Sequence, residues 1–257
     1  MMTLCLFIIA IASYLLGAVN GSIIASKYFF KKDIRNFGSG NAGLTNFYRI
    51  FGKTGIIVVL AIDIAKTAAA VLLGWGLMKI YDAGMVGKLF AGFFVMLGHA
   101  FPIYYDFKGG KGVLCGGILV LMLDWRIGLL CWLVFIIAVA ITRYVSLGSI
   151  CAGIMLPVGV ALFGGWWLQV VLALMCGLLL VIMHRQNILR LIAGMERKLS
   201  FGEPAGRPEG RDGEKNPAAE RAERPRPAQQ RTRRGGGARF SMLEDVDDDT
   251  GDEEDDD

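Results

Sequence analysis

The sequence predicts an all-α polytopic membrane protein of about seven transmembrane helices, followed by a disordered tail. Hydrophobic residues make up 54% of the 257-residue chain, and the mean hydropathy of +0.49 lies above the usual globular range. Apolar stretches separated by short polar gaps run from residue 1 to about residue 180. A charged segment with few apolar residues follows them.

Apolar windows interrupted by charge or glycine mark seven candidate spans, at about residues 3–25, 55–78, 86–104, 113–123, 127–141, 148–163 and 166–183. A full crossing needs about 20 residues, so several windows are short. Residues 113–141 also fit one long helix or a broken pair. The first window has no small-residue cleavage site after a short apolar core, so we expect a retained helix rather than a signal peptide.

Loop charge predicts the orientation. With seven crossings, residues 26–54, 105–112, 142–147 and those after 183 share one side of the membrane, which holds 13 Lys and Arg residues up to residue 202. The other side holds three, Lys79, Lys88 and Arg126. Lys and Arg are enriched in cytoplasmic loops. We therefore expect an outside N-terminus, a cytoplasmic C-terminus, and all the charged, glycine-rich loops on the cytoplasmic face.

Composition divides the chain into two parts. Residues 1–202 hold 17 Lys or Arg and 6 Asp or Glu, a balance of +11, whereas residues 203–257 hold 10 and 17, a balance of −7. The second part is rich in Pro, Gly, Ala, Arg and Glu and ends in a nearly all-acidic run. Such a composition buries too little apolar surface to offset the entropy of ordering. We expect a transmembrane domain over 1–202 and a disordered charged tail over 203–257.

The first cytoplasmic loop has a composition that suits a phosphate. It contains three glycines in six residues, which allow close approach of backbone N–H groups to a ligand. Its polar side chains are Ser39, Asn41, Thr45 and Asn46, with Arg35 and Arg49 at the ends. Guanidinium and hydroxyl groups also bind phosphate. A purely structural loop has a similar composition, so the loop alone leaves both interpretations open.

The second loop reads FKGGKG at residues 107–112. It lacks the GxxxxGK[ST] spacing of a nucleotide-binding P-loop, because Gly112 follows Lys111. What remains is a tight turn in which we expect glycines to free backbone amides and lysines to add positive charge. His99, at the end of the preceding apolar run, is expected to have a structural role.

The last polar segment begins at His184. If it is helical, His184, Asn187 and Leu191 share one face. Two charges, Asp63 and Lys66, lie deep in the second span with i, i+3 spacing. A charge inside a membrane is costly unless it faces the protein interior, so we expect a structural pair facing the bundle.

Together the loops resemble the acyl-phosphate:glycerol-3-phosphate acyltransferase (PlsY) family of bacterial inner membranes. The resemblance covers nearly all of residues 10–202 and rests on three ordered motifs, RNFGSGNAGLTNFYRIFG, LGHAFPIYYDFKGGKGV and HRQNILRLIAGMERK, with RYVSLGSI between the last two. It implies an enzyme that moves a fatty acyl group from acyl phosphate to the 1-hydroxyl of glycerol 3-phosphate. The products would be 1-acylglycerol 3-phosphate and phosphate, in phospholipid biosynthesis.

The resemblance also implies the site residues. The catalytic group would be Ser39, Arg49, His184 and Asn187. The substrate-binding residues would be Gly38, Gly40, Asn41, Thr45, Asn46, Lys108, Gly109, Gly110, Lys111, Gly112 and Ser149. Glu196 matches a carboxylate that supports structure. Acyl phosphate is a mixed anhydride with a good leaving group, so we expect no nucleophilic Ser or Cys, no metal and no cofactor.

The mechanistic hypothesis is direct attack of the substrate hydroxyl on the acyl carbon. Its proton would pass to His184 or to a substrate phosphate oxygen, and the sequence leaves this choice open. Glycine amides or Asn187 would stabilise the oxyanion, while Lys111 and Arg49 hold phosphates. Membrane lipid is an expected partner, nucleic acid is not, and functional interaction with an enzyme that produces acyl phosphate is possible.

Two other functions are compatible with parts of the sequence. A membrane transporter of a small phosphorylated solute would also have short spans interrupted by glycine and charge. It predicts two halves with matching interruptions, and the polar loops show no such repeat. A lipid-phosphate phosphatase would need a stronger arrangement of histidine and arginine than two histidines 85 positions apart.

Overall fold

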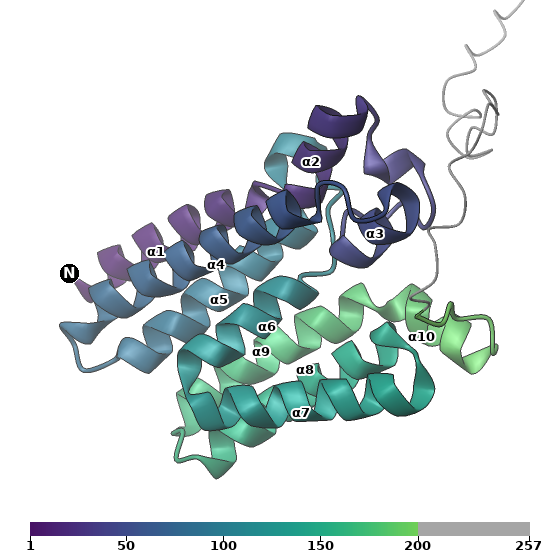
Figure 1. Ribbon diagram of the computed structural model, residues 1–257. Helices are drawn as coiled ribbons and strands as arrows, with labels where there is room; N and C mark the ends of the chain where they lie inside the picture. The colour runs from purple at the N-terminus through teal and green to yellow at the C-terminus, as the bar shows by residue number, and fades with distance from the viewer. Residues whose placement is uncertain (200–257) are drawn as a thin grey trace, which may run out of the picture. The chain divides into compact units, whose positions relative to one another are not determined.

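A computed structural model of the chain describes residues 1–199 and is all-helical over that range (Figure 1). Its ten α-helices are α1 (Met2–Ala18), α2 (Gly21–Phe30), α3 (Leu44–Phe51), α4 (Ile56–Lys79), α5 (Gly84–Ala100), α6 (Val113–Leu123), α7 (Trp125–Thr142), α8 (Val145–Leu162), α9 (Trp167–Met183) and α10 (Arg185–Ile192). Two short 3₁₀ turns, Ile34–Asn36 and Ile103–Tyr105, lie in the first two loops. The predicted disorder of the tail and the boundary at residue 202 lie outside the described residues.

Five segments of the described chain are long and apolar enough to cross a membrane. They are Met2–Phe30, which joins α1 to α2, Ile56–Lys79, Gly84–Tyr105, Trp125–Thr142 and Val145–Leu162. A sixth is the pair α9 and α10, which bends by 59° between its two helices. The remaining predicted span, α6, has only 11 residues, well short of the roughly 20 of a full crossing. The helices found therefore match the predicted windows, but only five or six of them have the length of a span.

The long helices form two groups that meet along α5 and α6. Helices α1, α4 and α5 pack together, and α7, α8 and α9 pack together. Helix α6 contacts α4 and α5 on one side and α7 on the other, while α5 also contacts α9. Figure 1 shows α2, α3 and α10 gathered at one end of the bundle. This end collects the polar loops.

Close helix packing relies on glycine where α4 crosses α5. A side-chain Cβ at Gly74 would overlap the backbone oxygen of Gly87, and a Cβ at Gly87 would overlap that of Gly74. Small residues are common at such crossings, because helices in a bilayer gain little from burying apolar surface and associate through close packing. An apolar core between the two groups includes Leu89, Met96 and Leu119.

Three helix breaks divide the apolar stretches, and the first of them differs from the prediction. The first window was expected to be unbroken, but it breaks after Val19 because Asn20 starts a new helix, its Oδ1 accepting from Ile23 N at 3.0 Å. Asp124 divides residues 113–141 in the same way and accepts from Arg126 N at 2.9 Å, so the broken-pair alternative is the correct one. The third break, at His184, separates α9 from α10.

Candidate active site

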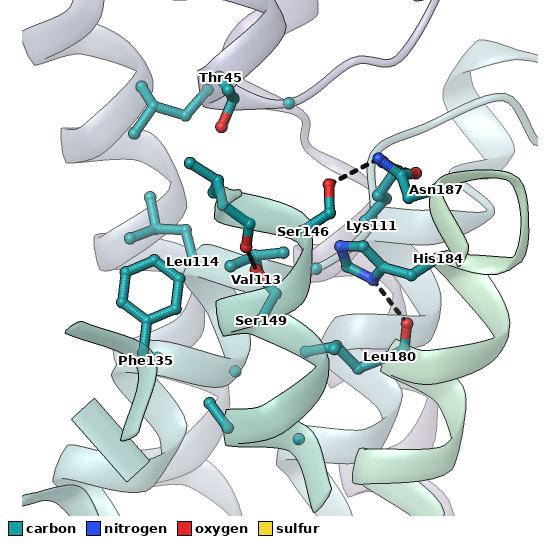
Figure 2. A pocket seen from close by; sticks show the side chains of 18 of the residues that line it. Thr45, Lys111, Val113, Leu114, Phe135, Ser146, Ser149, Leu180, His184 and Asn187 are labelled. Atoms are coloured by element: carbon teal, nitrogen blue, oxygen red, sulfur yellow. Dashed lines mark hydrogen bonds between the residues drawn. The ribbon is translucent and has the colours of Figure 1, made fainter. Parts of the chain in front are cut away.

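A cavity of about 570 Å³ opens between the two helix groups at the end that carries the loops. One end is polar and includes Ser39, Arg49, Lys111, His184 and Asn187. The other end runs between the helices and is lined mainly by apolar side chains such as Leu114, Val120, Trp132, Phe135, Leu156 and Leu180. Figure 2 shows Phe135 and Leu114 across the cavity from His184 and Asn187. The cavity thus suits a ligand with a charged head and an apolar chain.

Asn46 organises the first loop. Its Oδ1 accepts from Ser39 N at 3.1 Å, and its Nδ2 donates to the backbone oxygens of Phe37 and Asn41 at 3.0 and 3.1 Å. The turn passes through Gly38 and Gly40 with positive φ angles of 63° and 70°, a region that favours glycine. Asn46 therefore holds the turn, and this turn brings Ser39 to the cavity.

The glycine turn of FKGGKG differs from the expectation. We expected its glycines to free backbone amides, but Gly109 N donates to Ala100 O at 3.2 Å and Gly110 N donates to His99 O at 3.0 Å. Ala42 N in the first loop also donates to Gly109 O at 3.3 Å, so the two loops are tied together. These two glycine amides close the turn instead of facing a ligand. Because the glycines have no side chain, the turn can pack directly against His99 and Ala42.

Lys111 and Lys108 have different environments. Lys111 lines the cavity and donates from Nζ to Asn187 Oδ1. Burial lowers the pKa of Lys111 to about 8, with nearby Arg190 and Arg49 acting in the same direction and Glu196 against them. Lys108 is exposed and lies outside the cavity lining. Of the two lysines named from the sequence, the structure brings only Lys111 to the cavity.

A hydrogen-bond network fixes the amide of Asn187. Its Nδ2 donates to Ser146 Oγ at 2.7 Å and to Glu196 Oε1 at 2.8 Å, which directs Oδ1 towards Lys111. Ser146 Oγ donates to Glu196 Oε1 at 2.6 Å, and Arg190 Nε donates to Glu196 Oε2 at 2.8 Å. Figure 2 shows the bond between Asn187 and Ser146 beside Lys111. With both ends of its amide occupied, Asn187 orients Lys111 and has no free N–H for an oxyanion.

Glu196 stays ionised within this network. Its side chain is only 5% exposed. Burial acts to raise its pKa, but hydrogen bonds from Ser146, Arg190 and Asn187 outweigh that effect and lower the pKa below its ordinary value. A buried carboxylate with three donors is well satisfied. Glu196 therefore supports the site from the loop that follows α10.

His184 is buried at the bend between α9 and α10. Its Nδ1 lies 2.8 Å from Leu180 O. Because a carbonyl oxygen only accepts, Nδ1 carries the imidazole proton and Nε2 keeps its lone pair. The helix expected from His184 onward is present as α10, with His184 as its N-cap residue. Both His184 and Asn187 line the cavity, as expected from a shared face.

Positive charge at the polar end exceeds negative charge. Arg49, Arg190 and Arg197 line the cavity with Lys111, and Glu196 lies among them. Asp63, the other carboxylate of the lining, is paired with Lys66. Arg49 Nη2 donates to Arg197 O at 3.3 Å. Burial lowers the pKa of the Arg49 guanidinium, and Arg197 adds to that effect. An excess of partly buried cations attracts an anion such as phosphate.

A smaller cavity of about 170 Å³ adjoins the first. Both cavities are lined by Ser39, Asn41, Lys111, Asn187 and Arg190. The smaller one also includes Gly40, Gly109 and Arg185. Lys111 and Asn187 therefore lie between the two cavities and line both of them.

The structure gathers most of the residues named from the sequence. Those that line one or both cavities are Gly38, Ser39, Gly40, Asn41, Thr45, Asn46, Arg49, Gly109, Lys111, Gly112, Ser149, His184 and Asn187. Gly110 is buried against His99 and lines neither. Arg35, considered for anion binding, instead pairs with Asp33 through Nη2 at 2.8 Å and donates to Tyr105 O at 2.7 Å. Ser149 donates to Val145 O of its own helix at 2.9 Å.

The cavity lining also includes polar residues that were not assigned to it from the sequence: Asp63 and His99, which were expected to be structural, and Ser146, Arg190 and Arg197. Ser146 and Arg190 both bond to Glu196, and the backbone of Arg197 accepts from Arg49. Their roles depend on the loop after α10 folding back over α3 and α8. The sequence signal for Ser146 was its place in RYVSLGSI, three residues before Ser149.

Comparison with known proteins gives consistent matches. A family described as glycerol-3-phosphate acyltransferase matches residues 7–194. The glycerol-3-phosphate acyltransferase of Thermoanaerobacter pseudethanolicus (strain ATCC 33223 / 39E) is 38% identical over 190 residues, which cover 74% of this chain and 93% of that protein.

Two solved structures of PlsY (YgiH), an integral membrane glycerol 3-phosphate acyltransferase, are also similar. The glycerol 3-phosphate form has a TM-score of 0.67 and 32% identity, covering 76% of this chain and 96% of its own. The lysophosphatidic acid form has a TM-score of 0.66 and 30% identity, covering 76% and 95%.

Proposed function

This chain belongs to the glycerol-3-phosphate acyltransferase family, and we propose that its acyl donor is acyl phosphate. It is an integral membrane acyltransferase of phospholipid synthesis. In the proposed reaction the acyl group passes to the 1-hydroxyl of glycerol 3-phosphate. The products are 1-acylglycerol 3-phosphate and inorganic phosphate.

One observation carries this proposal: a single cavity joins a cationic end to an apolar end. Both proposed substrates bear phosphate, and the cationic end offers Arg49, Lys111 and Arg190 as partners. The fatty chain of the donor needs an apolar path, and residues such as Trp132 and Phe135 line one. A donor lying along the cavity would place its acyl carbon where the two ends meet, close to the hydroxyl of the acceptor.

The chemistry requires only substrate positioning, charge stabilisation and one proton transfer. The hydroxyl oxygen attacks the acyl carbon, the bond from that carbon to the phosphate oxygen breaks, and phosphate leaves with the electron pair. The hydroxyl proton has two available acceptors, the Nε2 of His184 and a substrate phosphate oxygen. Lys111 donates one ammonium proton to Asn187 and has others free. We therefore assign to Lys111 the stabilisation of the negative charge that develops on the oxyanion and on the departing phosphate.

The loop charges support a cytoplasmic site in a bacterial inner membrane. With the seven predicted crossings, 13 of the Lys and Arg residues up to residue 202 fall on the side that carries the polar loops, against three on the other. Glycerol 3-phosphate would then enter from the cytoplasm, and the fatty chain would stay within the bilayer. Functional interaction with an enzyme that produces acyl phosphate fits this arrangement, because a reactive anhydride is best used close to its source.

The test supplies purified protein in lipid vesicles with palmitoyl phosphate and glycerol 3-phosphate. We expect equal amounts of phosphate and lysophosphatidic acid, and vesicles without protein as the control should give neither. Activity with acyl-CoA or acyl carrier protein but not with acyl phosphate would overturn the donor assignment. Uptake of glycerol 3-phosphate into the vesicles without any acyl product would favour a transporter.

A further inference from the structure

Asp63, Lys66 and His99 form a buried cluster inside the bundle, with 2%, 5% and 3% exposure. Lys66 Nζ lies 2.8 Å from Asp63 Oδ1 and 2.9 Å from His99 Nδ1. It also donates to the backbone oxygens of Gly17 and Val19 at 3.1 and 2.7 Å, where α1 ends. The structure confirms that the Asp63–Lys66 pair faces the protein interior, and it adds His99 as a third member.

Lys66 does not need His99 to balance its charge or to satisfy its hydrogen bonds. Asp63 already balances the charge of Lys66, and the two carbonyl oxygens of Gly17 and Val19 take two of its three protons. A buried ion pair with these partners is satisfied without an imidazole. We therefore read the contact in the other direction: Lys66 holds the imidazole of His99 in place through its bond to Nδ1.

His99 in turn contacts the glycine turn. Its backbone oxygen accepts from Gly110 N at 3.0 Å. Its imidazole lies so close to Gly110 that a side-chain Cβ there would overlap Nε2, and would also lie 2.8 Å from Ala42 O. Asn20 Nδ2 donates to that same Ala42 oxygen at 3.1 Å. The ring of His99 therefore packs directly beneath the turn that precedes Lys111.

We propose that His99, anchored by Lys66 and Asp63, is a positioning residue for acyl transfer: it supports the Gly109–Gly110 turn and thereby places Lys111 at the phosphate end of the cavity. The catalytic part of this inference rests on the function proposed above. The structural part, support of the turn by the imidazole, is independent of any substrate. His99 also lines the cavity, but its Nδ1 is taken by Lys66, so we assign it to the positioning of Lys111 and not to proton transfer.

The experiment compares His99→Ala, which removes the ring and its acceptor, with His99→Asn, which keeps an oxygen near the place of Nδ1. The kinetic constants for glycerol 3-phosphate and the thermal midpoint in detergent are measured for each. We expect His99→Ala to raise KM about 10- to 100-fold with a smaller change in kcat, as displacement of a binding group by about 1 Å can do. His99→Asn should recover part of that loss.

Lys88→Met is the matched control. Lys88 lies on the same helix as His99, and its Nζ donates to Met122 O at 2.6 Å, at the far end of α6. The Lys88→Met variant should have a lower thermal midpoint but an unchanged KM for glycerol 3-phosphate. A folded His99→Ala variant with an unchanged KM overturns the inference, and so does His99→Asn being no better than His99→Ala.

Hydrogen exchange separates this inference from the proposed function. In the substrate-free protein, His99→Ala should speed exchange of the Gly109 and Gly110 amides, whereas Lys88→Met should leave them protected. This readout needs no activity. If the wild-type protein fails to use acyl phosphate while His99→Ala loosens the turn, the donor assignment is wrong and the support role stands. Unchanged exchange in His99→Ala overturns the support role.

Discussion

His99 and His184, the two histidines of the chain, carry their imidazole protons on opposite nitrogens. Lys66 Nζ lies 2.9 Å from Nδ1 of His99, and because an ammonium only donates, that nitrogen accepts and the proton lies on Nε2. Nδ1 of His184 lies 2.8 Å from a carbonyl oxygen and therefore carries the proton. Only His184 can accept a proton at Nε2, so only His184 is prepared to act as a base.

Replacement of His184 tests its role as base. If Nε2 takes the hydroxyl proton, His184→Gln and His184→Ala should lower kcat about 10²- to 10⁴-fold, the usual range for a lost general base. The measurement is steady-state turnover with palmitoyl phosphate, with thermal midpoints to confirm folding. Near-normal kcat in either variant would assign the proton to a substrate phosphate oxygen.

Lys111 and Lys108 form a matched pair three residues apart. Lys111→Met should raise KM for glycerol 3-phosphate about 10-fold or more, because it removes a charge-assisted hydrogen bond to phosphate. Lys108→Met should leave KM unchanged, because Lys108 is exposed and outside the cavity lining. The KM of each variant is measured from initial rates over a range of glycerol 3-phosphate concentrations. An unchanged KM in Lys111→Met removes this lysine from the phosphate site.

The lowered pKa of Lys111 predicts an alkaline limit to activity. Its ammonium, with a pKa of about 8, is charged below that pH and neutral above it. Therefore kcat/KM for glycerol 3-phosphate should fall by about tenfold per pH unit above pH 8. The phosphate of the substrate becomes fully charged above about pH 6, so the plateau should lie between these values.

Lys111→Arg provides the control for this pH profile. A guanidinium stays charged throughout the range, so the alkaline fall should disappear in the variant even if its KM is higher. Binding of phosphate should also raise the pKa of Lys111, which moves the fall in kcat to higher pH than the fall in kcat/KM. An alkaline fall at the same pH in Lys111→Arg would mean that another group is responsible.

Ser146 and Ser149 lie one helical turn apart and predict different losses. Ser146→Ala removes a partner from both Asn187 and Glu196, and should cost about 1 kcal/mol of stability, or about 2–4 °C in thermal midpoint. It should also lower kcat, because the amide that orients Lys111 is less firmly held. Ser149→Ala loses only a bond within its own helix. Equal midpoints for the two variants would contradict the network's role.

Removal of residues 203–257 should leave kcat and KM unchanged. All the site residues named above lie between residues 38 and 197, and the family match ends at residue 194. The measurement compares full-length and truncated protein in the same vesicles. A changed KM for either substrate would show that the tail acts on the site.

Hydropathy predicted where the helices lie and two of their three breaks. The apolar windows end at residues 123 and 183, next to Asp124 and His184. The window over residues 3–25 hid the break at Asn20, although Asn20 was visible as a local capping residue. The sequence did not indicate the contacts of Glu196 with Ser146 and Asn187, because Ser146 and the loop after α10 are distant in sequence.

Motif resemblance named residues that the structure gathers at the cavities, whereas residue type alone did not distinguish them from their neighbours. Lys108 and Lys111 look alike in FKGGKG, and only the path of the turn shows which one reaches the cavity. Arg35 looked suited to phosphate until Asp33, two residues before it, proved to be its partner. The free amides expected from Gly109 and Gly110 were wrong because their partners lie at the end of α5.

The contacts of Lys66 also bear on how the protein is made. As α4 leaves the ribosome and enters the bilayer, its lysine faces hydrocarbon unless acceptors are waiting, and a charge at mid-membrane costs about 2.5–3.5 kcal/mol even on insertion scales. Three of its four partners are Asp63 on the same helix and the carbonyl oxygens of Gly17 and Val19, all synthesised before it. The carbonyl oxygens at the end of α1 therefore provide acceptors for Lys66 when α4 inserts. They are in place because α1 is synthesised before α4.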